Sequence, residues 1–237
     1  MRTRFTTLGR AALLVAALLV VSAAAGVSSA SAAFTKVAIW EMNEPAGAQT
    51  MHDSSGKNRD GVIGNLVTTG VVDGNYTGYR FTAGDKDINR LVVVDHAALN
   101  PYGNIFKVFL RLKTTATGEN IIQKGQANTA GGSWKIEVNP EGHVVCTFRG
   151  AAGRGAVGSR GNLANDKWHG VLCIRRLNEV VMVVDGGIPR HDPGPTGRID
   201  NNADLTIGGK KFCTAPNVSC QYYDGLIDRI AIRRKRP

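Results

Sequence analysis

The sequence after residue 33 predicts an all-β fold, a sandwich or jelly roll. Short runs of β-branched and aromatic residues alternate with Gly, Asn, Asp and Pro about every ten residues, a rhythm typical of such folds. No long helical period interrupts it, and only Ala97–Leu99 suggests a short helical turn. Glycine-rich stretches at 127–132 and 150–161 predict loops at the edges of the sandwich.

Eleven runs have the composition of strands. In chain order they are Lys36–Met42, Thr77–Thr82, Leu91–Asp95, Ile105–Lys113, Ile121–Lys124, Ser133–Val138, His143–Arg149, Trp168–Arg175, Glu179–Asp185, Leu205–Gly208 and Leu226–Ile232. In Ile105–Lys113 the apolar residues fall mainly on one parity, which predicts one core face and one wet face. Trp168–Arg175 carries apolar residues on both parities, so we expect a central strand, followed by a long hairpin.

The N-terminus predicts a removable signal peptide over residues 1–32. Arg2, Arg4 and Arg10 precede an apolar run over 11–25, and Ala30-Ser31-Ala32 is an A-x-A cleavage site. A transmembrane anchor is the alternative, but the run is shorter than the roughly 20 residues that a span needs. We therefore expect a secreted, extracellular chain without stable membrane insertion.

Cleavage of the 237-residue precursor leaves a length that suits one domain. We assign the β-domain to residues 33–232 and a basic tail to residues 233–237. The net charge is +10, of which the three signal-peptide arginines contribute three. Such a tail is usually solvated, although it also favours anionic cell-wall polymers or acidic glycans. No recognition motif for nucleic acid is present.

All four cysteines follow the signal peptide, and export favours disulfides. Three pairings are possible, and spacing and strand context favour Cys146 with Cys173 and Cys213 with Cys220. The first pair would tie neighbouring strands and the second a loop. Zinc is the competing interpretation, but the cysteine spacing and the missing His pair do not support it.

Several stretches resemble the laminin G-like branch of the concanavalin A-like lectin/glucanase superfamily. They are Trp40–Gly47 with Asp53–Gly56, Tyr79–Phe81 with Gly84-Asp85, Leu91–Asp95, Asp166–Val171 with Val184–Gly186, Leu205–Gly209 and Tyr223–Ile230. The resemblance implies a jelly roll of two antiparallel sheets. It also implies that most of these residues specify the fold.

No catalytic motif stands out. The glucanase strand pattern Glu-x-Asp-x-x-Glu is missing, Asp85 and Asp87 lie in a predicted loop, and Glu41 and Glu44 fall where the family places structure. There is no G-x-S-x-G elbow, and the histidines lack metalloprotease spacing; we expect His169 to make a local hydrogen bond. We therefore expect a non-enzyme, with a divergent polysaccharide hydrolase or lyase as the alternative.

The resemblance also implies one structural calcium ion. Asp228 matches the usual side-chain donor and Asp53 is a second candidate, with backbone carbonyls near Asn43 and Gly84 completing the set. The alternative is that Asp228 caps a turn or pairs with an arginine.

The family further implies a recognition module for a glycan or another cell-surface polymer. Sugar sites use aromatic platforms, but Trp40 and Trp168 are expected in the core. The remaining aromatic candidates, for which we also favour core packing, are Trp134, Tyr102, Tyr222 and Tyr223. The sequence therefore identifies no ligand residue, and a protein-binding or structural domain stays an alternative.

Overall fold

The computed structural model describes residues 1, 33–84, 87–211, 213 and 219–235. The predicted signal peptide lies almost wholly outside these residues, as do Asp85 and the last two residues of the predicted tail. Within the described residues no helix is long and apolar enough to cross a membrane.

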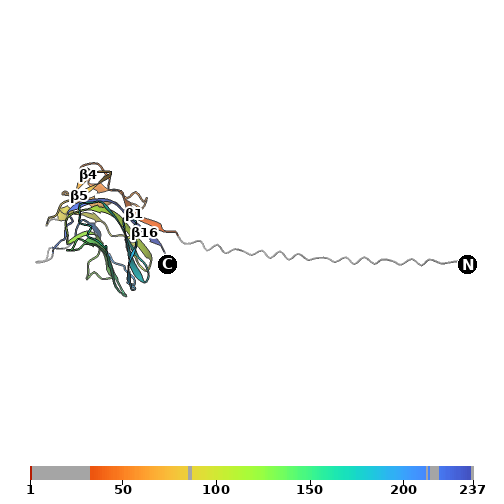
Figure 1. Cartoon of the computed structure of the whole chain (residues 1–237). Helices are drawn as coiled ribbons and strands as arrows, with labels where there is room; N and C mark the ends of the chain where they lie inside the picture. The colour runs from red at the N-terminus through yellow and green to blue at the C-terminus, as the bar shows by residue number, and fades with distance from the viewer. Residues whose placement is uncertain (2–32, 85–86, 212, 214–218, 236–237) are drawn as a thin grey trace. The chain divides into compact units, whose positions relative to one another are not determined.

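Two antiparallel sheets build the domain, which confirms the predicted sandwich (Figure 1). Sheet A holds, in spatial order, β14 (Arg190–Pro193), β13 (Glu179–Val184), β12 (His169–Arg175), β7 (Ile105–Lys113), β16 (Gly225–Lys235), β5 (Tyr76–Phe81) and β4 (Thr68–Asp73), with β1 (Thr35–Trp40) also paired to β16. Sheet B holds β11 (Gly153–Gly158), β10 (Val144–Gly150), β9 (Ser133–Val138), β8 (Glu119–Lys124), β15 (Leu205–Ile207), β6 (Leu91–Val93), β3 (Gly61–Ile63) and β2 (Thr50–Met51). Two 3₁₀ turns, η1 (Asp87–Asn89) and the predicted η2 (Ala97–Leu99), complete the elements.

The last strand is longer than its composition predicts. β16 continues through Arg233, Arg234 and Lys235, past the predicted end at Ile232. Its backbone pairs with β7 on one side and with β5 and then β1 on the other, so ladder hydrogen bonds hold residues whose side chains are polar (Figure 1). The first part of the predicted tail is therefore strand.

Inward-facing side chains of both sheets form one core. Along β7, burial alternates residue by residue, as the sequence pattern predicts. Trp134 of sheet B lies 5.5 Å from Phe106 of sheet A and 6.4 Å from Phe148, measured between ring centroids. The contact of Trp134 with Phe106 joins the two sheets, whereas Phe148 lies beside Trp134 in sheet B.

Both predicted disulfides are present. Cys146 and Cys173 are fully buried and connect β10 of sheet B to β12 of sheet A. The expectation that this bridge ties neighbouring strands is wrong, because the two strands belong to opposite sheets and meet through the core. Cys213 and Cys220 close a loop, as predicted.

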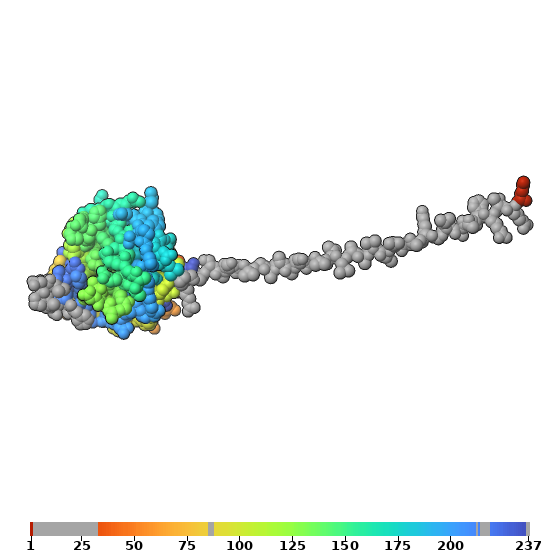
Figure 2. Space-filling view, turned by 90° about the horizontal axis from the view of Figure 1, so that it is seen from below, coloured from red at the N-terminus to blue at the C-terminus, as the bar shows by residue number. Residues whose placement is uncertain are grey.

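The stretch 150–161, predicted as a loop, contains strand β11. Close packing explains the glycine at 155, because a Cβ there would lie 2.6 Å from the Val180 side chain of β13. Figure 2 shows surface from the middle of the chain, green to blue-green, directly beside surface from the blue C-terminal part. Composition alone does not distinguish such a strand from a loop.

Candidate functional site

A row of polar side chains crosses the outer face of sheet B. Gln123 of β8 is opposite Thr206 of β15 and Lys135 of β9, and Lys135 is opposite Thr147 of β10. Residues paired in this way point to the same side of a sheet. Their chain neighbours, such as Ile122 and Ile136, point into the core. The row therefore faces away from the core.

Two adjoining cavities of about 370 and 380 Å³ lie over this row. They share Gln123 and the wall formed by residues 125–127. Thr206, Asp204 and Lys211 line the first cavity, whereas Lys135, Thr147, Arg149, Arg154 and Lys210 line the second. We call the two cavities together the sheet-B groove.

The floor of the groove holds polar groups that lack partners. Gln123, Thr147 and Thr206 are 5, 6 and 2% exposed. Within the described residues neither Thr147 Oγ1 nor Thr206 Oγ1 has a hydrogen-bond partner, and the Gln123 side chain makes no hydrogen bond. A buried hydroxyl without a partner costs about 1–3 kcal/mol, so such groups are rare in folded proteins. Both hydroxyl oxygens are also almost inaccessible to solvent, so a ligand can reach the Gln123 amide but would reach these hydroxyls only if neighbouring side chains moved.

One end of the groove is strongly basic. Arg149 and Arg154 are directly opposite each other on β10 and β11, and neither has an acidic partner among the described residues. Lys210 also lines this end, and burial together with the nearby charge of Lys135 lowers its pKa. The Lys135 ammonium pairs with Glu137. At the other end Asp204 pairs with Lys211.

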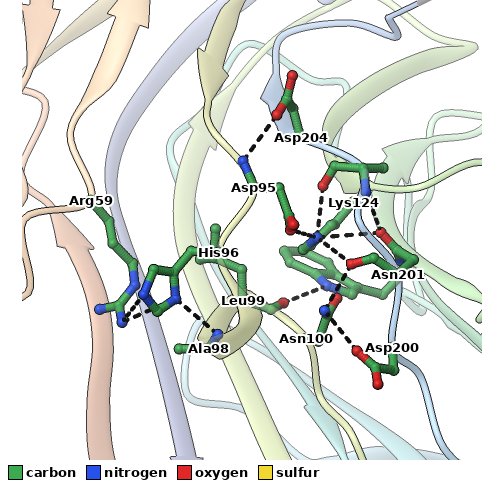
Figure 3. A network of polar contacts seen from close by, with 12 residues as sticks. Arg59, Asp95, His96, Ala98, Leu99, Asn100, Lys124, Asp200, Asn201 and Asp204 are labelled. Atoms are coloured by element: carbon green, nitrogen blue, oxygen red, sulfur yellow. Dashed lines mark hydrogen bonds and ion pairs between the residues drawn. The ribbon is translucent and has the colours of Figure 1, made fainter.

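The wall of the groove is supported from the core side of β8 (Figure 3). The Lys124 ammonium is fully buried and contacts Asp95 Oδ1, both oxygens of Asn201 and the carbonyl oxygen of Ala203. Asp204 accepts a hydrogen bond from the Asp95 backbone, so the loop that carries Ala203 and Asp204 is fixed against sheet B.

A second polar cluster lies on sheet A. Trp168 is half-buried there, 5.1 Å from Tyr76 between ring centroids, and its ring N–H donates to Asp73 Oδ2. The expectation that Trp168 anchors the core is wrong, because its parity along the chain is opposite to that of the core residues Val171 and Cys173.

This second cluster contains two carboxylates but lacks the features of a glycosidase pair. The Lys113 ammonium lies 2.9 Å from Asp73 and 3.7 Å from Asp166. The hydrogen bonds from Lys113 and Trp168 lower the pKa of Asp73, whereas a general acid needs a raised pKa. His169 lies between Asp185 and Asn165, in the local contacts expected of it.

The two calcium candidates are engaged separately. Asp228 Oδ2 lies 3.1 Å from the Arg111 guanidinium, and Asp53 accepts backbone hydrogen bonds from Ile39, Ser55 and Arg59. No group of three or more His, Cys, Asp or Glu side chains in the described part of the chain is placed to hold a metal ion. These surroundings do not fit the six to eight oxygen ligands of calcium, and calcium stays a prediction.

The other aromatic candidates do not form a sugar platform in the groove. Trp40, Trp134 and Tyr223 are fully buried, and Tyr222 is nearly so. The Arg198 guanidinium lies over the Tyr102 ring, with Cζ 4.6 Å from the ring centroid, and both residues line a different cavity from the groove.

The family comparison matches the described strands. Residues 119–235, from β8 to β16, match the family model of the laminin G domain. This β-sandwich is a laminin G-like domain. No curated protein sequence matches the chain significantly.

Solved structures share the fold of this laminin G-like domain at low sequence identity. The binding domain of Paraclostridial Mosquitocidal Protein 1 has a TM-score of 0.60 and 13% identity, over 86% of this chain and 48% of that chain. The chain thus spans about half the length of that structure. Domain 4 of AbnA, a GH43 extracellular arabinanase from Geobacillus stearothermophilus, in complex with arabinotriose, has a TM-score of 0.56 and 15% identity, over 87% and 94%.

Sequence reasoning did not find the sheet-B groove, although a signal was available. Thr206, Gln123, Lys135 and Thr147 each occupy an outward parity position of a strand. The pairing that aligns them, and the loops that bury them, depend on sheet order, which a single sequence does not determine.

Proposed function

We propose that this laminin G-like domain is a secreted, non-catalytic binding module whose sheet-B groove binds a carbohydrate. The observation that carries the proposal is the Gln123 amide, which makes no side-chain hydrogen bond within the described residues and lies where the two cavities adjoin, in one row with Thr147 and Thr206. Hydroxyl and amide groups can donate hydrogen bonds to sugar hydroxyls and can also accept hydrogen bonds from them. The two disulfides are compatible with export.

The charge of the groove favours an acidic polymer over a neutral one. Arg149 and Arg154 lie opposite each other without an acidic partner in the described residues, and like charges placed so destabilise a sheet. A uronic acid carboxylate between them would relieve this repulsion and accept paired guanidinium hydrogen bonds.

A glycan array that contains neutral, uronic acid and sulfated polysaccharides tests the proposal. We expect the strongest signal from an acidic glycan, and a reducing-sugar assay on that glycan should detect no turnover. Turnover would contradict the non-catalytic assignment. Silence on every glycan would favour a protein partner.

Variants then place the binding site. Gln123→Ala should weaken the strongest interaction about tenfold, the loss of roughly one net hydrogen bond. Tyr76→Ala, in the sheet-A cluster, is the matched control and should leave the Kd unchanged. The opposite pattern would move the site to Tyr76 and Trp168.

A further inference from the structure

The surroundings of the Lys124 ammonium have the chemistry of a metal site. One carboxylate oxygen, from Asp95, one amide oxygen, from Asn201, and two backbone carbonyls, from Asn201 and Ala203, converge on Nζ. Carboxylates, amide oxygens and backbone carbonyls are the ligands that calcium takes in proteins. The contacts span 2.5 to 3.3 Å, the range of hydrogen bonds from an ammonium.

We propose that the Lys124 ammonium occupies the place of a structural cation, so that this domain keeps its fold and its groove without calcium. The four oxygens come from two segments: Asp95, just after β6, and the connection between β14 and β15, which carries Asn201 and Ala203. The ammonium therefore joins these two segments, beside the hydrogen bond from the Asp95 backbone to Asp204 (Figure 3).

The charge count favours an ammonium over calcium at this point. Asp95 supplies the one carboxylate that touches Nζ, and a single positive charge balances it. A divalent ion held by the same four oxygens would meet only this one carboxylate directly, because Asp204 and Asp200, whose charges also act on the site, pair with Lys211 and Arg198. The ammonium is also covalently attached to β8, so no chelator can remove it.

A comparable arrangement surrounds Arg175, a second cation that is 1% exposed. Arg175 donates to the Asn104 carbonyl, to the Gly197 carbonyl and to Thr196 Oγ1, and thereby fixes the loop at 196–197. The single connection between β14 and β15 is thus held by an internal cation at two points, by Arg175 near residue 197 and by Lys124 near residue 202. This pattern contrasts with Asp53 and Asp228, whose oxygens face N–H donors.

The first test uses the unmodified chain with both disulfides intact. Its Tm should be the same in a chelator and in millimolar calcium chloride, and a calorimetric titration with calcium should give no saturable heat. A saturable rise of several degrees with calcium would overturn the proposal, and this measurement decides it even if a variant does not fold.

The second test removes the internal cation. Lys124→Ser should lower the Tm by about 10 °C in chelator, because it leaves buried oxygens without a partner. Calcium should then restore about 4 °C at tenfold above its Kd, relative to sodium chloride of equal ionic strength. Equal Tm values in the two salts would contradict the proposal. Lys135→Ser, on the neighbouring strand, is the control and should show no response to calcium.

Discussion

Gln123 and Lys124 are adjacent residues of β8, but the Lys124 side chain is fully hydrogen-bonded whereas the Gln123 side chain makes no hydrogen bond within the described residues. Lys124 points to the core side, where its ammonium meets four oxygens (Figure 3). Gln123 points outward, into a row in which two buried hydroxyls have no partner among the described residues. Both regions are polar and nearly inaccessible to solvent. Burial of a polar group therefore does not by itself indicate function. A missing partner points to a ligand only where a cavity lies beside the group, as at Gln123, because Asn100 Oδ1 near the Lys124 network is also buried without a partner in the described residues.

The largest change in stability should come from a variant that disrupts the hydrogen bonds around the Lys124 ammonium. Lys124→Met removes the charge but keeps most of the volume, and it should lower the free energy of unfolding by about 3–5 kcal/mol because it leaves the Asp95 carboxylate unpaired. Urea unfolding measures the loss. Lys135→Met, which removes a partly exposed lysine paired with Glu137, should cost less than about 1 kcal/mol. Equal losses would show that the Lys124 contacts are not special.

A somewhat smaller effect on stability is expected from Glu119, at the other end of β8. It is largely buried and accepts a hydrogen bond from the Asp224 backbone, and burial together with the nearby Asp224 carboxylate raises its pKa to about 7. Because the folded pKa exceeds the ordinary value of 4.5, stability should be highest below pH 4.5 for this group and should fall as the pH rises to about 7.

Glu119→Gln should abolish that fall, which amounts to about 3 kcal/mol. The variant should therefore be more stable than the original chain at pH 8 and similar to it at pH 5, as measured by urea unfolding. Glu141→Gln, at an exposed position, is the control and should leave the pH dependence intact. A variant that is less stable at pH 8 would mean that the charged Glu119 is stabilising.

Variants of the two groove threonines should change the free energy of unfolding in the opposite direction to Lys124→Met. Thr206→Val and Thr147→Val each replace a buried hydroxyl, which has no partner in the described part of the chain, with a methyl group. Each should therefore raise the free energy of unfolding by about 1 kcal/mol. Thr69→Val is the matched control: the Thr69 hydroxyl bonds to Pro45 and Ala48, and its removal should destabilise the domain. If all three variants lose stability alike, the groove hydroxyls have partners in solution.

The sequence predicted those parts of the fold that depend on local pattern. Strands with clear alternation, such as Ile105–Lys113 and Ser133–Val138, have their predicted bounds. β11 is rich in glycine and the end of β16 is basic, so their composition predicts a loop and a tail. Both are nevertheless strands, because their backbones pair with neighbouring strands. The short strands β2 and β3 were not predicted, because two or three residues carry too little periodicity.

The candidate site was less predictable than the fold. Family resemblance directed attention to Asp228, Asp53 and the tryptophans, whereas the groove and the Lys124 network are formed by residues with no motif. Lys124 and Asp95 are 29 positions apart, and Thr206 and Thr147 come from strands separated by four others in the chain. Only the sheet order brings such residues together.

The smallest effect should come from the charged end of the groove. Arg149→Gln removes one of two guanidinium groups that are opposite each other on β10 and β11, and it should raise the free energy of unfolding by roughly 0.2–1 kcal/mol at low salt. The gain should shrink as salt is added, because the repulsion is screened. Lys57→Gln removes the same charge from an exposed loop and should change neither the free energy of unfolding nor its dependence on salt. The same Arg149 variant should reduce the salt dependence of binding to an acidic glycan, so a site that uses this repulsion would show a small gain in stability together with a loss of affinity. A gain without any loss of affinity would separate the basic end from the glycan site and restrict the site to Gln123 and the two threonines.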